Sequence, residues 1–211
     1  MPTPEETAFM NDPKTFMEDN ILRVVCGEQF AGQYDFSLVP ANIPSKRKNR
    51  KGRAIQYYEL TRDDAGDVPM WFLPYAPNDV REYTLPTTGA DLMVTVQLNG
   101  CTFGHAQSGT NSGCYVTHHN ASRDGNAPDV IEGQTINNPY TDPFRYFHQT
   151  RYRKQRKGNV DDRYFATVVG KRDGLNHWRF FAQKKKLVYN SLLGESPQDL
   201  WTLKGVVLVN P

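Results

Sequence analysis

The stretch from Asp91 to His119 constrains the fold of this 211-residue chain more than any other. It begins with Leu92–Leu98, a run in which every second residue is apolar, as expected of a strand with one buried face. The run ends at Asn99-Gly100, where glycine permits backbone conformations that other residues resist. We therefore expect a strand that stops sharply just before Cys101.

A hairpin is predicted directly after this turn. A second short strand, Thr102–His105, enters a loop rich in Gly, Ser and Asn over residues 107–113, and the chain returns through Cys114–His119. The two strands of a hairpin lie side by side, so the histidines that end the returning strand are brought near Cys101. One cysteine beside one histidine is the minimum for a thiolate nucleophile with its base.

Three interpretations of this cluster are open. In the first, the cysteines are small buried hydrophobic residues, which is the common state of a free cysteine. In the second, two Cys-x3-His pairs bind zinc, although the chain lacks the short CxxC spacing of many zinc sites. The pairs are Cys101 with His105 and Cys114 with His118. In the third, Cys101 and a histidine form the centre of a thiol hydrolase.

Composition and charge exclude several classes of protein. The chain has 11 Tyr, 11 Phe and 3 Trp, too many aromatic residues for a disordered protein. Its net charge is only +2, so no overall charge favours nucleic acid or a membrane surface. Three cysteines without a framework spacing predict free thiols in a reducing compartment. We expect one domain spanning residues 1–211.

The N-terminal segment predicts no secretory signal. Its sequence, MPTPEETAFMNDPKTF, is acidic and lacks the basic and apolar regions of a signal peptide. No run of roughly 18 apolar residues is present that could span a membrane. We therefore expect a protein that is made and kept soluble and that, if exported, leaves by a route without a cleaved signal.

Most of the remaining chain has the patterns of strands. Residues 3–19 favour one or two short helices, with polar caps and Pro13 in a first turn. Strand-like patterns follow at 21–26, 34–39, 54–60, 68–73, 82–85, 163–172, 175–184 and 200–209. Asp173-Gly174 predicts a hairpin, and Lys184–Lys186 predicts a charged sheet edge. The expected fold class is α/β of the α+β kind: a single domain of two mixed β-sheets packed as a sandwich, with short helices and long loops.

Two basic segments keep a binding function open. Residues 45–53 (SKRKNRKGR) carry six Lys and Arg, and residues 145–157 interleave basic with aromatic side chains. Such a mixture can stack on bases and hold phosphates, or form a helix with an apolar inner face. Residues 120–139 predict a long loop of the kind that often forms a substrate wall. A basic RNA-binding module without catalysis is therefore the alternative to an enzyme.

The residues around the hairpin resemble a known signature. Leu98-Asn99-Gly100-Cys101 followed by Val116-Thr117-His118 resembles the Leu-Ser-Gly-Cys and histidine motif of bacterial glutamine deamidase toxins. That family includes Burkholderia lethal factor and the catalytic domain of cytotoxic necrotizing factor. Two earlier segments, 36–42 (FSLVPAN) and 70–75 (MWFLPY), resemble segments of the lethal factor branch in the same order. Asn99 stands in place of the motif's serine, and the loop between the cysteine and the histidine is longer.

The resemblance implies a role for each residue of the motif. Cys101 matches the nucleophile, His118 the base, and Thr95 the threonine that orients the base. Independently, an even spacing would place Thr95 and Cys101 on one face of a single extended strand. The turn at Asn99 and Gly100 would supply backbone N–H groups to an oxyanion.

The longer loop leaves His119 as an alternative base. Alternation along the returning strand places His118 on the face of Cys114 and Val116, and His119 on the opposite face. We therefore favour His118.

The resemblance also implies an activity: a cysteine-dependent glutaminase that deamidates a glutamine of a host protein through a Cys-His-Thr centre. The lethal factor branch modifies the DEAD-box RNA helicase of translation initiation and so blocks translation, and a Rho-family GTPase is the target expected of the necrotizing factor branch. The expected protein is thus a toxin or effector that is made in the bacterial cytoplasm and acts in the host cytosol. It is expected to be a monomer with a single catalytic domain over residues 1–211, to need no cofactor and no metal, and not to bind nucleic acid directly. A Cys–His protease or transglutaminase would use the same residues, and the residues alone do not select glutamine.

Overall fold

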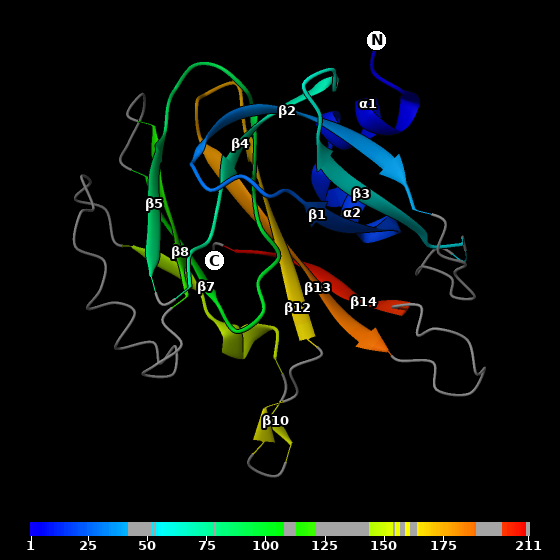
Figure 1. Ribbon diagram of the computed structural model, residues 1–211, viewed down its shortest axis with the longest axis vertical. Coiled ribbons are helices and arrows are strands. Elements are labelled where there is room, and N and C mark those ends of the chain that lie inside the picture. Colours follow the sequence, from blue (N-terminus) through cyan, green and yellow to red (C-terminus); the bar gives the residue numbers. More distant parts are fainter. Residues whose placement is uncertain are drawn as a thin grey trace.

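The computed structural model describes residues 1–41, 52, 54–77, 79–107, 113–120, 144–153, 155–156, 159–160, 164–188 and 200–209. Two short helices open the chain, α1 (Pro4–Asn11) and α2 (Pro13–Asp19), and strands dominate from there on (Figure 1). Thr3 caps α1 in a capping box with Glu6, and Asp12 caps α2. The helices predicted over residues 3–19 are therefore confirmed. Among the described helices, none is long and apolar enough to cross a membrane.

Eight strands form a large sheet in the order β1-β3-β2-β4-β6-β12-β13-β14. They are β1 (Asn20–Val25), β2 (Gly32–Pro40), β3 (Gln56–Arg62), β4 (Val68–Leu73), β6 (Leu92–Thr95), β12 (Tyr164–Arg172), β13 (Trp178–Val188) and β14 (Leu200–Leu208). β1 runs parallel to β3 and β4 parallel to β6, whereas the other neighbours are antiparallel. This sheet is mixed, as predicted.

Four strands form a small sheet in the order β5-β8-β7-β9. They are β5 (Val80–Leu85), β7 (Thr102–Ala106), β8 (Cys114–His119) and β9 (Arg145–Phe147). The predicted hairpin is confirmed, since β7 pairs with β8 and places Phe103 opposite His118. The expectation of a second mixed sheet is wrong, because every pair here is antiparallel, as a hairpin and its added edge strands allow.

The segment after β9 does not form the α-helix that its apolar and basic residues allowed. It contains a short 3-10 helix, η1 (Gln149–Arg151), and a ribbon of β10 (Gln155–Arg156) with β11 (Asn159–Val160). The other basic segment, 45–53, lies outside the described residues except for position 52, and so do residues 121–139 of the predicted loop.

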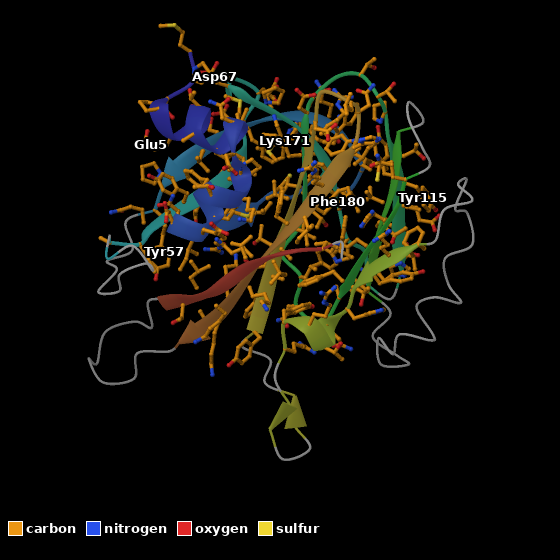
Figure 2. All side chains as sticks on the ribbon, turned by 180° about the vertical axis from the view of Figure 1, so that it is seen from behind. Glu5, Tyr57, Asp67, Tyr115, Lys171 and Phe180 are labelled. Carbon is orange, nitrogen blue, oxygen red and sulfur yellow. The ribbon has the colours of Figure 1, made fainter. Side chains whose placement is uncertain are left out.

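The large sheet separates two hydrophobic cores. The helices cover one face, and the small sheet covers part of the other (Figure 1). Seen from behind, the helices lie at one side and the small sheet, marked by Tyr115, at the other (Figure 2). The helix-side core includes Phe9, Met17, Leu22, Phe36 and Val94, and the core under the small sheet includes Leu98, Phe103, Val116, Phe147 and Phe180. The α+β class, with two main sheets and two short helices, is confirmed.

The large sheet is nearly barrel-shaped, because it curls until its first strand approaches its last three. Side chains make this closure: Gln183 on β13 accepts a hydrogen bond from the Leu22 backbone N–H at 2.9 Å. Thr167 on β12 donates to the Leu22 carbonyl at 3.3 Å, and Lys185 on β13 donates to the same carbonyl. The prediction of a charged edge at Lys184–Lys186 is wrong, because β13 lies between β12 and β14 and Lys185 is fully buried.

Candidate active site

The chain passes from the large sheet to the small one at the turn before Cys101. β6 ends at Thr95, Leu98 makes one bridge to β12, and β7 begins at Thr102. Gly100 has φ +84°, a left-handed conformation that favours glycine. The predicted single strand through Leu98 therefore ends early. The even spacing of Thr95 and Cys101 does not place them on one strand face, because β6 ends at Thr95 and Cys101 lies outside it, directly before β7.

A hydrogen bond between the two sheets holds the His118 ring. Thr95 Oγ1 on β6 lies 2.7 Å from His118 Nδ1 on β8, and the same hydroxyl donates to the Leu73 carbonyl at 2.8 Å. A hydroxyl has one proton, so Thr95 accepts from His118, and the imidazole proton is on Nδ1. This bond fixes the ring's orientation and leaves the lone pair on Nε2.

His118 Nε2 is buried and has no hydrogen-bond partner within the described part of the chain. Buried polar atoms in proteins are nearly always bonded, so such an atom calls for a functional explanation. Burial lowers the pKa of His118 to about 3, with a smaller contribution from His119, and the ring is neutral at pH 7. A neutral imidazole with an available Nε2 can act as a general base.

Cys101 lies directly before β7 and is 5% exposed. It belongs to the core under the small sheet, together with Phe103 and Val116. Phe103 is opposite His118, so Cys101 is diagonal to that histidine, a relation that corresponds to about 7 to 8 Å between α-carbons in a regular sheet. Burial raises the pKa of the Cys101 thiol to about 11, opposed by the Asn99 hydrogen bond and by the charge of Arg153.

The expectation that the Cys101 sulfur lies within hydrogen-bond reach of a histidine is not met. The sulfur's recorded partner is the Asn99 carbonyl at 4.0 Å, and among the described contacts none joins it to His118 or His119. The thiol thus points toward the backbone of the turn that precedes it. In enzymes without substrate, catalytic hydrogen bonds are often long and tighten when substrate binds.

The second histidine of the strand, His119, faces the other side of the small sheet. Its Nε2 lies 2.8 Å from Thr117 Oγ1, and its ring packs edge-on against Tyr146. Burial lowers the pKa of His119 to about 4, with a smaller contribution from His148. The two alternative bases are thus on opposite faces, and His118 is the one on the face of Cys101.

The four potential zinc ligands do not gather around one point. Over the described ranges, no group of three or more His, Cys, Asp and Glu could hold a metal ion. Cys114 donates to the Ala106 carbonyl at 3.3 Å, and His105 packs against Phe103 and Phe180. Burial strongly raises the pKa of the Cys114 thiol.

Sequence reasoning missed three side chains beside the site. The half-exposed Tyr75 has its ring centre 6.1 Å from that of His118. Tyr152 donates to the Cys101 carbonyl at 2.8 Å, and Arg153 donates to the Asn99 side chain at 2.8 Å. Tyr152 is 51 residues beyond Cys101, so no local pattern relates the two. For Tyr152 and Arg153, the sequence signal was the basic and aromatic composition of residues 145–157. Tyr75 ends the segment 70–75 that resembles the lethal factor branch.

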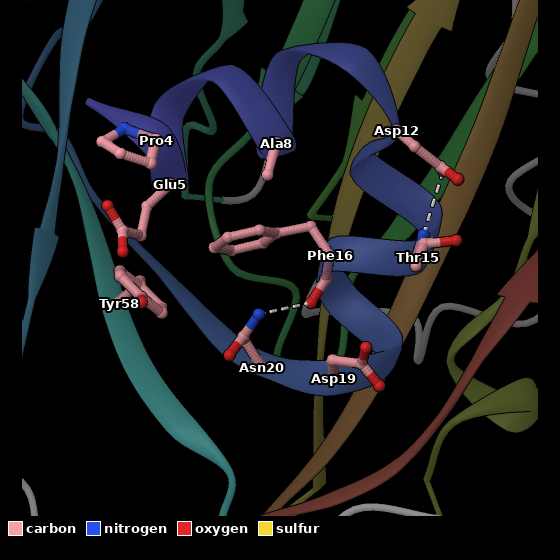
Figure 3. Close-up of a pocket in the computed structure, with 9 residues that line it drawn as sticks. All are labelled: Pro4, Glu5, Ala8, Asp12, Thr15, Phe16, Asp19, Asn20 and Tyr58. Atoms are coloured by element: carbon pink, nitrogen blue, oxygen red, sulfur yellow. Dashed lines mark hydrogen bonds between the residues drawn. The ribbon is translucent and has the colours of Figure 1, made fainter. Parts of the chain in front are cut away.

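A groove of about 440 Å³ lies between α1, α2 and Tyr58 (Figure 3). Its polar groups serve the helix ends: Asp12 accepts from the Thr15 N–H, and Asn20 donates to the Phe16 carbonyl, both at 3.0 Å. These bonds account for the groove's polar lining, and we assign no chemistry to it.

Neither a protein-family model nor a curated protein matches this sequence. Function is therefore argued from the geometry of the site and from the motif at its centre.

Proposed function

We propose that this protein is a cysteine-dependent protein-glutamine deamidase, with Cys101 as nucleophile, His118 as base and Thr95 as the residue that orients the base. The observation that carries the proposal is the bond between Thr95 and His118, which leaves a neutral ring with an unpartnered Nε2 on the face of Cys101. Nδ1 of His119 is also buried without a partner in the described residues, but His119 lies on the opposite face of the small sheet, so of these two histidines it is His118 that combines an available nitrogen with the face of Cys101.

The first half of the reaction releases ammonia. His118 Nε2 takes the thiol proton as Cys101 Sγ attacks the carbon of the glutamine side-chain amide. Backbone N–H groups of the turn at Gly100 stabilise the oxyanion that forms. The intermediate collapses when His118 returns the proton to the nitrogen, so that the C–N bond breaks and a thioester remains.

The second half forms glutamate. His118 takes a proton from a water molecule, which attacks the thioester carbon, and the C–S bond breaks. The proton returns to the sulfur, and the enzyme is restored. Replacement of NH2 by OH adds about one mass unit to the substrate.

Access to the site is proposed to run past Tyr75. Both reacting groups are buried, with Cys101 5% and His118 0% exposed, whereas the neighbouring Tyr75 is 50% exposed. The substrate amide therefore has to displace buried neighbours, and the thiol has to turn toward His118 Nε2 as the amide enters.

The wider setting follows from the motif over residues 98–101 and 116–118. We propose a toxin or effector that acts as a monomer in the host cytosol on a host protein. The first candidate target is the DEAD-box helicase of translation initiation, and the second is a Rho-family GTPase. The small sheet on the curled large sheet would correspond to the sandwich expected of these toxins.

The test is whole-proteome mass spectrometry of a eukaryotic lysate incubated with the protein or with Cys101→Ser. We expect one host glutamine to gain about one mass unit, only with the parent protein. Equal modification by Cys101→Ser would refute the proposal. Cleaved chains would indicate a protease instead, and crosslinked chains a transglutaminase. RNA affinity that is unchanged in Cys101→Ser, without any modification, would favour the binding module.

A further inference from the structure

The turn that carries Cys101 is held by a segment distant in sequence. Tyr152, directly after η1, is 4% exposed and donates from its hydroxyl to the Cys101 carbonyl at 2.8 Å. Its ring stacks on Phe147 of β9, with centres 5.6 Å apart and planes 18° from parallel. Tyr152 therefore ties the backbone of the nucleophile to the edge of the small sheet.

The next residue, Arg153, covers the turn itself. Its Nη2 donates to the Asn99 side-chain oxygen at 2.8 Å, and its Nη1 donates to Gln149 at 3.1 Å. A Cβ built on Gly100 would lie 3.1 Å from both terminal nitrogens and 3.2 Å from Cζ. Glycine at this position therefore admits the guanidinium as well as the positive φ, and the charge lies over the peptide that precedes Cys101.

A positive charge beside Cys101 would help the proposed mechanism, because the buried thiol has to lose its proton. A thiol hydrolase needs a thiolate, which a neighbouring cation stabilises. The buried His118 is neutral at pH 7, so it carries no positive charge before it takes the thiol proton. Burial of Cys101 works against the thiolate, and Arg153 is the cation that works for it.

We propose that Arg153 is a positioning residue of the active site, which holds the Asn99–Cys101 turn and supplies the fixed positive charge that stabilises the Cys101 thiolate. The role rests on the proposed function of Cys101. On this proposal, Arg153 of the basic and aromatic segment 145–157 acts at the turn before Cys101 and not in binding nucleic acid.

The test measures the thiolate directly, without any protein substrate. Alkylation of Cys101 is followed by mass spectrometry in a Cys26→Ser background, because Cys26 is the more exposed thiol. Below the pKa of the thiol, the rate follows the thiolate fraction. Arg153→Gln should slow reaction with neutral iodoacetamide about tenfold, the effect of a pKa raised by one unit. Reaction with anionic iodoacetate should slow further.

Two variants serve as controls for this measurement. Arg151→Gln removes an exposed charge from the same turn of chain and should leave both rates unchanged. Arg153→Lys keeps the charge and should restore most of the rate, which loss of fold would not allow. The ratio of the two reagents separates charge from accessibility, since a loosened turn changes both rates alike.

Equal rates in the parent and in Arg153→Gln, whether fast or undetectable, would overturn the proposal. If Arg153→Gln does not fold, Asn99→Ala releases the guanidinium from its anchor and should slow alkylation several-fold. No change in that variant would also overturn it. The outcome is separate from the deamidase assay: lysate modification that depends on Cys101 can stand while this role fails, and the reverse.

Discussion

The fold contains two clusters of buried polar side chains, one that closes the large sheet and one between the two sheets. They differ in how many of their polar atoms have hydrogen-bond partners. The first closes the barrel: Lys185 donates to the Leu22 carbonyl, to Gln97 at 3.0 Å and to Thr167 at 2.8 Å. Gln183 accepts from the Leu22 N–H and donates to the carbonyls of Met17 and Asn20 at 2.7 Å. Its side-chain amide is bonded at both ends, and it joins α2 and β1 to β13.

The second cluster joins the two sheets at the candidate site. Thr95 is fully bonded, between the Leu73 carbonyl and His118 Nδ1. His118 Nε2 is buried without a partner within the described ranges, and the Cys101 thiol makes only a long contact to Asn99. The imidazole of His118 is therefore hydrogen-bonded at Nδ1 and has no partner at Nε2 within the described ranges.

This difference in hydrogen bonding suggests that the first cluster stabilises the fold and the second serves the proposed reaction. A buried polar network that is fully satisfied stabilises one arrangement of the chain, whereas an unsatisfied buried atom costs stability and is retained where it is used. Changes in the barrel cluster should therefore alter stability, and changes at the open end of the site should alter activity.

The largest effect is expected from removing the nucleophile or the base. Cys101→Ser and His118→Ala should each lower the rate of deamidation by roughly 10⁴-fold or more, because the two groups act as a unit. The melting temperature of Cys101→Ser should stay near that of the parent, whereas His118→Ala also loses the bond to Thr95 and leaves a cavity, so it should fold but melt at a lower temperature. Rates from time-resolved mass spectrometry and melting curves on the same samples check this. If His118→Ala did not fold, the second cluster would be needed for stability, as the first is, and the proposed difference between the two clusters would be wrong.

The second effect concerns the barrel cluster and pH. Burial lowers the pKa of Lys185 from 10.5 to about 7, with a smaller contribution from Arg23. Between these values the unfolded chain binds a proton that the folded chain does not, so the free energy of unfolding should rise with pH. The rise should reach about 4 kcal/mol between pH 7 and 10.5, and it should be absent in Lys185→Met. Urea unfolding at several pH values measures it, and parallel curves for both proteins would contradict it.

A smaller effect is expected at Thr95. Thr95→Val removes the hydroxyl that orients His118, and should lower kcat about 10- to 100-fold, as a misplaced catalytic group does. It should also cost about 1 to 2 kcal/mol of stability, because the Leu73 carbonyl and His118 Nδ1 lose their partner. Thr95→Ser keeps the hydroxyl and is the matched control. Steady-state kinetics measure kcat, and urea unfolding measures stability. Equal kcat in the Val and Ser variants would show that Thr95 does not orient the base.

The smallest effect on activity is expected at His119. This ring bonds Thr117 on the far face of the small sheet, so His119→Gln should leave kcat within about twofold of the parent. It should lower stability by about 1 kcal/mol through the lost bond. A loss of activity comparable to that of His118→Ala would exchange the roles of the two histidines.

Local patterns in the sequence predicted local elements well. Val68–Leu73 and Cys114–His119 have the predicted bounds, because apolar residues bounded by Pro74 or by the glycine-rich loop leave little freedom. The hairpin of β7 and β8, and the separation of His118 from His119, follow from the same short-range alternation.

What failed depends on contacts between distant residues. The alternating run over residues 92–98 predicts one strand, yet β6 ends at Thr95 and the chain joins the other sheet at Thr102. Three consecutive lysines are typical of an edge, yet Lys185 is buried because β14 pairs with β13 and acceptors 88 and 163 residues away receive its protons. Arg153 escaped notice for the same reason.

The crossing at Gly100 has a consequence for how the protein becomes active. Thr95 belongs to the barrel and His118 to the four-stranded sheet, so the bond that orients the base exists only after the two have docked. Secondary structure alone cannot assemble it. A partly folded chain with both sheets formed but apart would contain every residue of the proposed centre without the bond between Thr95 and His118, so recovery of the proposed deamidase activity during refolding would report the final docking step.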